Sequence, residues 1–188
     1  MINEIITTTI FIFFILDPFI SIPVFLTLAK KATPQEKKTI ANHAILIAGA
    51  LAGLFIVFGT SFLDAIGIGF NSFRIAGGIV LALMGLENVL DFSFNKTKNA
   101  DYENISVIIA TPLLTGPGMA TTLIIFTQKI GALITSIATI SALLAAWVIL
   151  LNADKIQKTV GPKVIRIISK VMGLLIIAFG IQLIITSI

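Results

Sequence analysis

The sequence contains no cysteine and a single histidine, His43. The lack of cysteine excludes disulfides, thiolate-held iron–sulfur clusters and thiol redox chemistry, and one histidine excludes a polyhistidine metal site. Charged residues are also scarce, at 12% of the 188 residues, compared with about 25% in soluble globular domains. We therefore expect no cofactor and no resident metal. The function is expected to depend on the hydrophobic segments, which make up most of the chain.

Hydrophobic residues make up 57% of the chain, and the mean hydropathy is +1.07. They form continuous runs instead of alternating with polar residues, which is typical of membrane spans of about 20 residues. The loops between the runs are short, so no soluble domain is expected. The pattern predicts an all-α, polytopic membrane bundle with six transmembrane segments: Ile5–Leu28, Ile40–Phe62, Phe73–Leu90, Ile105–Phe126, Ala132–Leu151 and Val164–Ile188.

The basic residues follow alternate spans, and eleven of the thirteen fall on one side of the predicted bundle. Because cytoplasmic loops are rich in Lys and Arg, we expect a cytoplasmic-membrane protein with both termini outside. The net charge of +4 belongs to these loops, so the lipid bilayer, not a nucleic acid, is the expected partner. The eleven are Lys30, Lys31, Lys37, Lys38, Lys96, Lys98, Lys155, Lys158, Lys163, Arg166 and Lys170; Arg74 and Lys129 are on the other side.

An internal repeat relates the two halves of the chain. Asp17–Pro23 and Thr111–Pro117 both read x-Pro-x-x-[Ser/Thr]-x-Pro, 94 residues apart, and Gly78–Glu87 aligns with Gly173–Gln182. We expect one membrane domain over 1–188, made of repeats 1–95 and 96–188 with three spans each. An odd number of spans turns the second copy upside down, and inverted repeats are typical of transporters.

Two prolines interrupt the middle of both the first and the fourth predicted span. A proline inside a helix costs about 3 kcal/mol, so we predict two half-helices at each place. Pro23 and Pro117 suit the first turn of the second half-helix, with Ser21 and Thr115 as its N-caps.

The N-terminus of each second half-helix carries a partial positive charge that suits a carboxylate. Gly116 and Gly118 leave backbone uncovered, which suits a small ligand. The predicted substrate-binding residues are Asp17, Pro18, Ser21, Ile22, Pro23, Thr111, Pro112, Thr115, Gly116, Pro117 and Gly118.

Asp17 lies near the middle of the first span, where an aspartate costs about 2.5–3.5 kcal/mol on insertion scales. Two interpretations stay open. In the first, Asp17 binds an ammonium group or carries a proton. In the second, it is a neutral carboxylic acid that bonds backbone groups freed by the helix break.

Three segments carry a resemblance to a known family: Leu16–Leu26, Phe73–Leu90 and Ala110–Ile124. They resemble the MarC family of integral membrane proteins, also called the small neutral amino acid transporter family. The resemblance implies a six-span inverted-repeat transporter of the wider LysE-like group, with glycine, alanine and similar amino acids as substrates. It places the binding residues on the two broken segments, Asp17–Pro23 and Thr111–Gly118.

Competing functions are less well supported by the residues present. The chain has no Gly-x-Ser-x-Gly or His-Glu-x-x-His motif and one central aspartate, so an intramembrane protease lacks catalytic parts and we do not expect an enzyme. Export of another small solute or of a metal ion stays open as an alternative. Transport by alternating access, coupled to protons or sodium, is the function that we expect.

Overall fold

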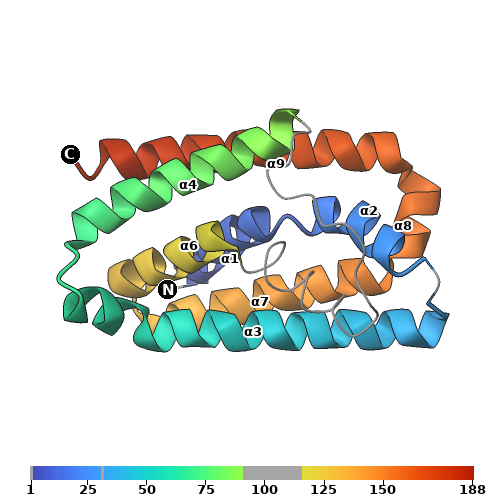
Figure 1. Cartoon of the computed structure of the whole chain (residues 1–188), viewed down its shortest axis with the longest axis horizontal. Helices are drawn as coiled ribbons and strands as arrows, with labels where there is room; N and C mark the ends of the chain where they lie inside the picture. The colour runs from blue at the N-terminus through green and yellow to red at the C-terminus, as the bar shows by residue number, and fades with distance from the viewer. Residues whose placement is uncertain (1, 31, 91–115) are drawn as a thin grey trace.

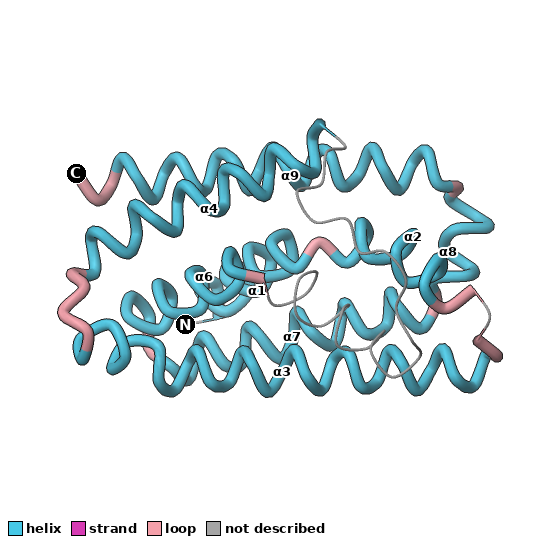
Figure 2. The backbone as a smooth tube through the Cα atoms, in the orientation of Figure 1, coloured by secondary structure: helices cyan, strands magenta, loops and turns pink. Residues whose placement is uncertain are grey.

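The computed structural model describes residues 2–30, 32–90 and 116–188. Within these ranges every regular element is an α-helix (Figures 1 and 2). The helices are α1 (Ile2–Leu16), α2 (Pro18–Leu28), α3 (Pro34–Ala65), α4 (Phe70–Leu90), α6 (Pro117–Ile130), α7 (Ala132–Leu151), α8 (Ala153–Val160) and α9 (Pro162–Ile185).

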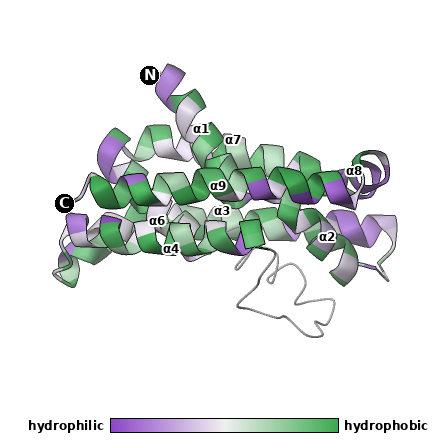
Figure 3. Cartoon of the chain, turned by 90° about the horizontal axis from the view of Figure 1, so that it is seen from above, coloured by the Kyte–Doolittle hydropathy of each residue, from purple (hydrophilic) through white to green (hydrophobic). Residues whose placement is uncertain are grey.

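Five of the helical segments are long and apolar enough to cross a membrane, with α1 and α2 together forming the first. Their large apolar side chains are exposed along the outside of the bundle, as expected where lipid is the solvent. Figure 3 shows hydrophilic residues gathered mainly toward the two ends of the bundle. The predicted membrane helical bundle is therefore confirmed, whereas the first half of the predicted fourth span lies outside the described residues.

The helix boundaries follow local signals. α3 begins with a capping box, in which the Thr33 hydroxyl accepts from the Glu36 backbone and the Glu36 carboxylate accepts from the Thr33 backbone. It runs for 32 residues, longer than the predicted second span. α7 has the predicted bounds, Ala132–Leu151, between glycine and asparagine caps.

The bundle has three layers when viewed as in Figure 1. α3 and α7 pack against each other on one side, α4 and α9 pair on the opposite side, and α1, α2 and α6 lie between them. The partners within each outer pair run in opposite directions, and both chain termini lie at the same end. The Lys37 ammonium and the Asp154 carboxylate, 2.9 Å apart, join the starts of α3 and α8 at the other end.

Four glycines bring α4 and α9 into backbone contact. A Cβ atom on Gly78 would lie 2.5 Å from the carbonyl oxygen of Gly180, and a Cβ on Gly180 would lie 2.5 Å from that of Gly78. Gly85 and Gly173 show the same reciprocal relation, at 2.5 and 2.8 Å. Close approach of this kind is how helices associate in lipid, where no hydrophobic effect drives them together.

Candidate functional site

The first membrane segment is interrupted at Asp17. α1 ends at Leu16 and α2 begins at Pro18, and Asp17 between them adopts φ 35° and ψ 65°. It is the only described non-glycine residue with positive φ. Aspartate is among the few residues that tolerate this left-handed conformation. The predicted break in the first span is therefore present, in the interior of the bundle.

The Asp17 carboxylate is buried and joins three helices. One oxygen accepts hydrogen bonds from the Ile20 backbone of α2 and from the Ser169 hydroxyl of α9, both at 3.3 Å. The other oxygen accepts from the Asn88 amide of α4 at 3.0 Å. Asp17 is only 3% exposed. The helix break is thus tied by its carboxylate to the α4–α9 pair.

The position of the break differs from the predicted one by about one turn. Asp17 caps α2 and Pro18 occupies its first turn, where a proline loses no hydrogen bond. Ser21, which we expected to be the cap, lies inside the helix, and its hydroxyl donates to the Asp17 carbonyl at 3.4 Å. Pro23 lies in the interior of α2, with its side chain on the outer surface. Ser21 and Ile22 are fully buried.

At the second predicted break the structure describes only the second half-helix, α6, which begins at Pro117. Pro117 is in its first turn, as predicted, but the N-cap is Gly116 and not Thr115. Glycine has no side chain with which to cap the helix, so its first N–H groups are not covered by the cap residue. Thr111, Pro112 and Thr115 lie outside the described residues, and their predicted binding role stays a prediction.

Gly118 contacts α4 closely. A Cβ atom added to it would lie 2.5 Å from the Met84 sulfur and 2.8 Å from a methyl carbon of Leu81. The space that we expected beside Gly118 is therefore filled by α4. Its neighbour Pro117 is exposed, whereas Gly116 is buried. Among the three, Gly116 is the residue whose position best suits contact with a ligand inside the protein.

The N-terminal ends of α2 and α6 both lie near the middle of the molecule, and the two helices run from there toward opposite ends (Figures 1 and 2). Each end carries a partial positive charge of about half a unit. At α2 that charge faces the carboxylate of its own cap, Asp17. At α6 the cap residue, Gly116, contributes no charge. The two starts are therefore similar in placement and opposite in electrostatic character.

Sequence reasoning missed two residues that contact Asp17, namely Asn88 and Ser169. Both lie within predicted spans, Phe73–Leu90 and Val164–Ile188, and a polar residue inside a span is itself a signal of function or of a buried partner. The place of Asn88 near the end of its span instead suggests the membrane interface. Both residues are far from Asp17 along the chain, so the sequence does not indicate that they form hydrogen bonds with it.

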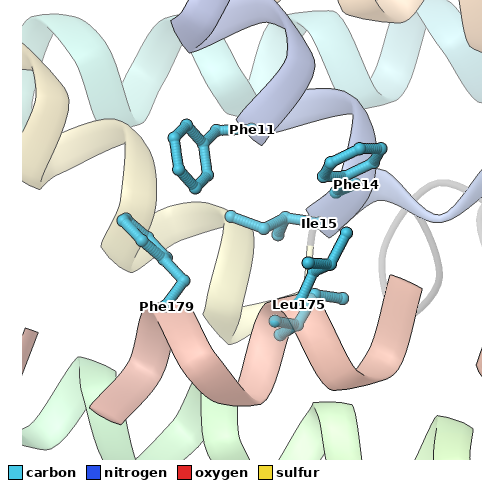
Figure 4. A pocket seen from close by; sticks show the side chains of 6 residues that line it. Phe11, Phe14, Ile15, Leu175 and Phe179 are labelled. Atoms are coloured by element: carbon cyan, nitrogen blue, oxygen red, sulfur yellow. The ribbon is translucent and has the colours of Figure 1, made fainter. Parts of the chain in front are cut away.

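A small apolar pocket lies beside the break, between α1 and α9 (Figure 4). Phe11 and Phe179 approach each other across it, with ring centroids 4.8 Å apart. Leu175 is 46% exposed, so the pocket opens at the outer surface of the bundle. The remaining lining residues are Phe14, Ile15 and Ile176. The pocket is a place where α1 is loosely packed against α9.

Long apolar helices and a buried aspartate at a helix break define a multi-pass membrane protein whose interior carries a polar site. Comparison with known proteins places this molecule more closely: the model of the MarC family of integral membrane proteins matches residues 2–188. The chain belongs to the MarC family, and the predicted family resemblance is confirmed.

Relatives in archaea and bacteria match over nearly their whole length. A UPF0056 membrane protein of Methanocaldococcus jannaschii is 32% identical over 188 residues, covering 94% of this chain and 92% of the relative. A UPF0056 membrane protein of Buchnera aphidicola from Baizongia pistaciae is 29% identical, covering 96% and 94%. The UPF0056 inner membrane protein YhgN of Escherichia coli K12 is 27% identical, also covering 96% and 94%. No solved structure matches the chain.

Proposed function

We propose that this protein is a secondary transporter that moves small neutral amino acids across the cytoplasmic membrane by alternating access. The observation that carries the proposal is the buried Asp17 carboxylate at the break in the first span. Broken helices whose ends meet at membrane depth are typical of transporter binding sites. An acidic group inside a span is costly, and in most membrane proteins it serves an ion or a substrate.

The two helix starts suit the two charges of an amino acid. The ammonium group of the substrate is expected to bind near the Asp17 carboxylate. The substrate carboxylate is expected at the start of α6, where Gly116 leaves the N–H groups of the first turn without a side-chain cap. The start of α2 is a poorer place for the carboxylate, because Asp17 already caps it.

We further propose that the two halves form an inverted repeat of six spans, with both termini outside. The reciprocal glycine contacts support this arrangement, because the alignment of Gly78 with Gly173 and of Gly85 with Gly180 converts one contact pair into the other. The antiparallel course of α4 and α9 also supports it (Figure 1). Reporter fusions after Lys37 and Lys158 should be cytoplasmic, and a cytoplasmic C-terminus would contradict the proposed orientation.

Uptake into proteoliposomes tests the transport function. Purified protein should accumulate labelled glycine and alanine under an imposed proton or sodium gradient, whereas labelled divalent metals should stay outside. Asp17→Asn should abolish accumulation, because it removes the buried charge while preserving the size of the side chain. Asp64→Asn, which changes an exposed aspartate at the end of α3, is the matched control and should transport normally. Metal uptake without amino acid uptake would contradict the proposal.

A further inference from the structure

Asp17 has more hydrogen-bond donors around its carboxylate than a helix cap requires. Its carboxylate needs only the Ile20 backbone to cap α2, yet it also receives Asn88 from α4 and Ser169 from α9. These two side chains come from positions 71 and 152 residues away in the sequence. Three separate helices therefore present polar atoms to one buried carboxylate.

The donors to the carboxylate are electrically neutral. An amide, a hydroxyl and a backbone N–H bond the two oxygens of Asp17. The partial positive charge at the start of α2, about half a unit, offsets only part of the charge of a carboxylate. Burying an ionised carboxylate is costly unless a positive group accompanies it. A cation beside Asp17 would therefore lower the cost of burying its charged form.

Asn88 and Ser169 are able to bind in two ways. An asparagine side chain offers an NH₂ donor and a carbonyl acceptor, and a serine hydroxyl is both donor and acceptor. In the structure both donate to Asp17. With a cation against the carboxylate, rotation of the amide and of the hydroxyl presents their oxygen atoms instead. The same three side chains then supply only oxygen ligands, which hard cations prefer.

We propose that Asp17, Asn88 and Ser169 form a binding site for a small monovalent cation, in which Asn88 and Ser169 change from hydrogen-bond donors to cation ligands. The cation is either the primary ammonium group of a transported solute or a sodium ion that accompanies it. This site deepens the proposed function, but its binding test needs no transport. Because the three ligands belong to the helix break, α4 and α9, cation binding changes the contacts between the break and the α4–α9 pair.

Thermal unfolding in nanodiscs of neutral lipid tests the site. The midpoint is measured at increasing sodium chloride or methylammonium chloride, with choline chloride keeping the total salt constant. Stabilisation by a bound ligand saturates with its concentration and yields a dissociation constant. We expect sodium or methylammonium to stabilise the protein and choline not to, because choline is bulky and has no N–H group. Stabilisation by sodium alone identifies a coupling-ion site, and stabilisation by methylammonium alone identifies the site of the solute ammonium.

Variants separate a ligand role from a structural one. Ser169→Ala, which removes one hydroxyl, should raise the dissociation constant of the cation at least tenfold. Asn88→Leu should have an effect of the same size. Asn42→Leu is the matched control, because the Asn42 carbonyl accepts a 2.8 Å bond from the Trp147 indole between α3 and α7, away from Asp17. It should lower the unfolding midpoint but leave the dissociation constant unchanged. If Asn88→Leu does not fold, Ser169→Ala and Asp17→Asn carry the test.

The outcomes separate this site from the proposed transport of amino acids. Equal effects of sodium, methylammonium and choline on the wild-type protein would overturn the cation site, even if alanine is transported. Wild-type dissociation constants in the Ser169→Ala and Asn88→Leu variants would overturn it as well. Conversely, cation binding that depends on both residues, in a protein that does not transport amino acids, would support the site and contradict the substrate.

Discussion

The starts of α2 and α6 lie in similar places near the middle of the molecule and are built differently (Figure 1). α2 begins at Asp17, whose side chain caps its own helix and bonds α4 and α9. α6 begins at Gly116, which has no side chain, and its next residues pack directly on α4 through Gly118. The start of α2 is held by polar bonds to a carboxyl group, whereas the start of α6 is packed closely on α4 and has a cap residue without a side chain.

The comparison suggests a division of roles. A site built from two identical helix ends would suit two anionic groups, whereas one acidic start and one uncapped start suit a molecule with both charges. The difference also predicts that the two starts respond to substitution in different ways. Substitutions that remove or measure this difference should have effects that decrease in size from Asp17 to the two prolines.

Asp17→Ala should have the largest effect on stability. Alanine cannot cap α2, which costs about 1 kcal/mol. It also leaves the donors of the half-buried Asn88 and the buried Ser169 without their acceptor, at about 1–3 kcal/mol. It also disfavours the positive φ of this position. We expect a total loss of roughly 3 kcal/mol by denaturant or thermal unfolding. Asp17→Asn keeps the cap and should lose less than half as much, and equal losses would show that the cap is unimportant.

Gly118→Val should destabilise the protein through packing. The added side chain overlaps Leu81 and Met84 of α4, and overpacking typically costs about 1–3 kcal/mol. Because the overlap is with a helix, binding of glycine and alanine should weaken by similar factors. Gly53→Val is the control, since a Cβ there meets nothing within 4 Å, and it should be nearly neutral. A selective loss of alanine binding would instead place Gly118 against the substrate.

Gly116→Asp makes the start of α6 resemble that of α2. The new carboxylate should occupy the position that we assign to the substrate carboxylate. Amino acid affinity, measured by ligand-dependent thermal shift, should fall at least tenfold, or about 1.4 kcal/mol. The comparison variant is Gly116→Asn, which adds a side chain of the same size without the charge. Equal losses in both variants would mean that bulk, not charge, is responsible.

The prolines at equivalent places in the repeat should respond in opposite directions. Pro23 lies inside α2, so Pro23→Ala restores a backbone donor and should stabilise the protein by about 1 kcal/mol. Pro117 lies in the first turn of α6, where no donor is missing, so Pro117→Ala should lower stability by a few tenths of a kcal/mol. The unfolding midpoint of each variant is compared with that of the wild-type protein. Shifts of the same sign would contradict the assigned helix starts.

The membrane spans could be predicted from the sequence because continuous apolar runs of membrane length are rare in soluble domains. The break in the first span was predictable for a related reason, since two prolines and an aspartate are rare inside such a run. Its position was not, because Asp17 and Ser21 are both good caps and partners from distant parts of the chain decide between them. The close packing of Gly118 on α4 could not be predicted, because a glycine facing a ligand and one facing a helix look alike in a sequence.

The four glycines between α4 and α9 also restrict how this family can vary. A larger residue at any one of them would press against a backbone carbonyl of the opposite helix, and a backbone atom cannot turn aside as a side chain can. A change at Gly78 would therefore require a compensating shift at Gly180, and a change at Gly85 one at Gly173. In related chains we expect these positions to stay small or to covary in pairs. The sequences of α4 and α9 are thus not free to diverge independently at these positions.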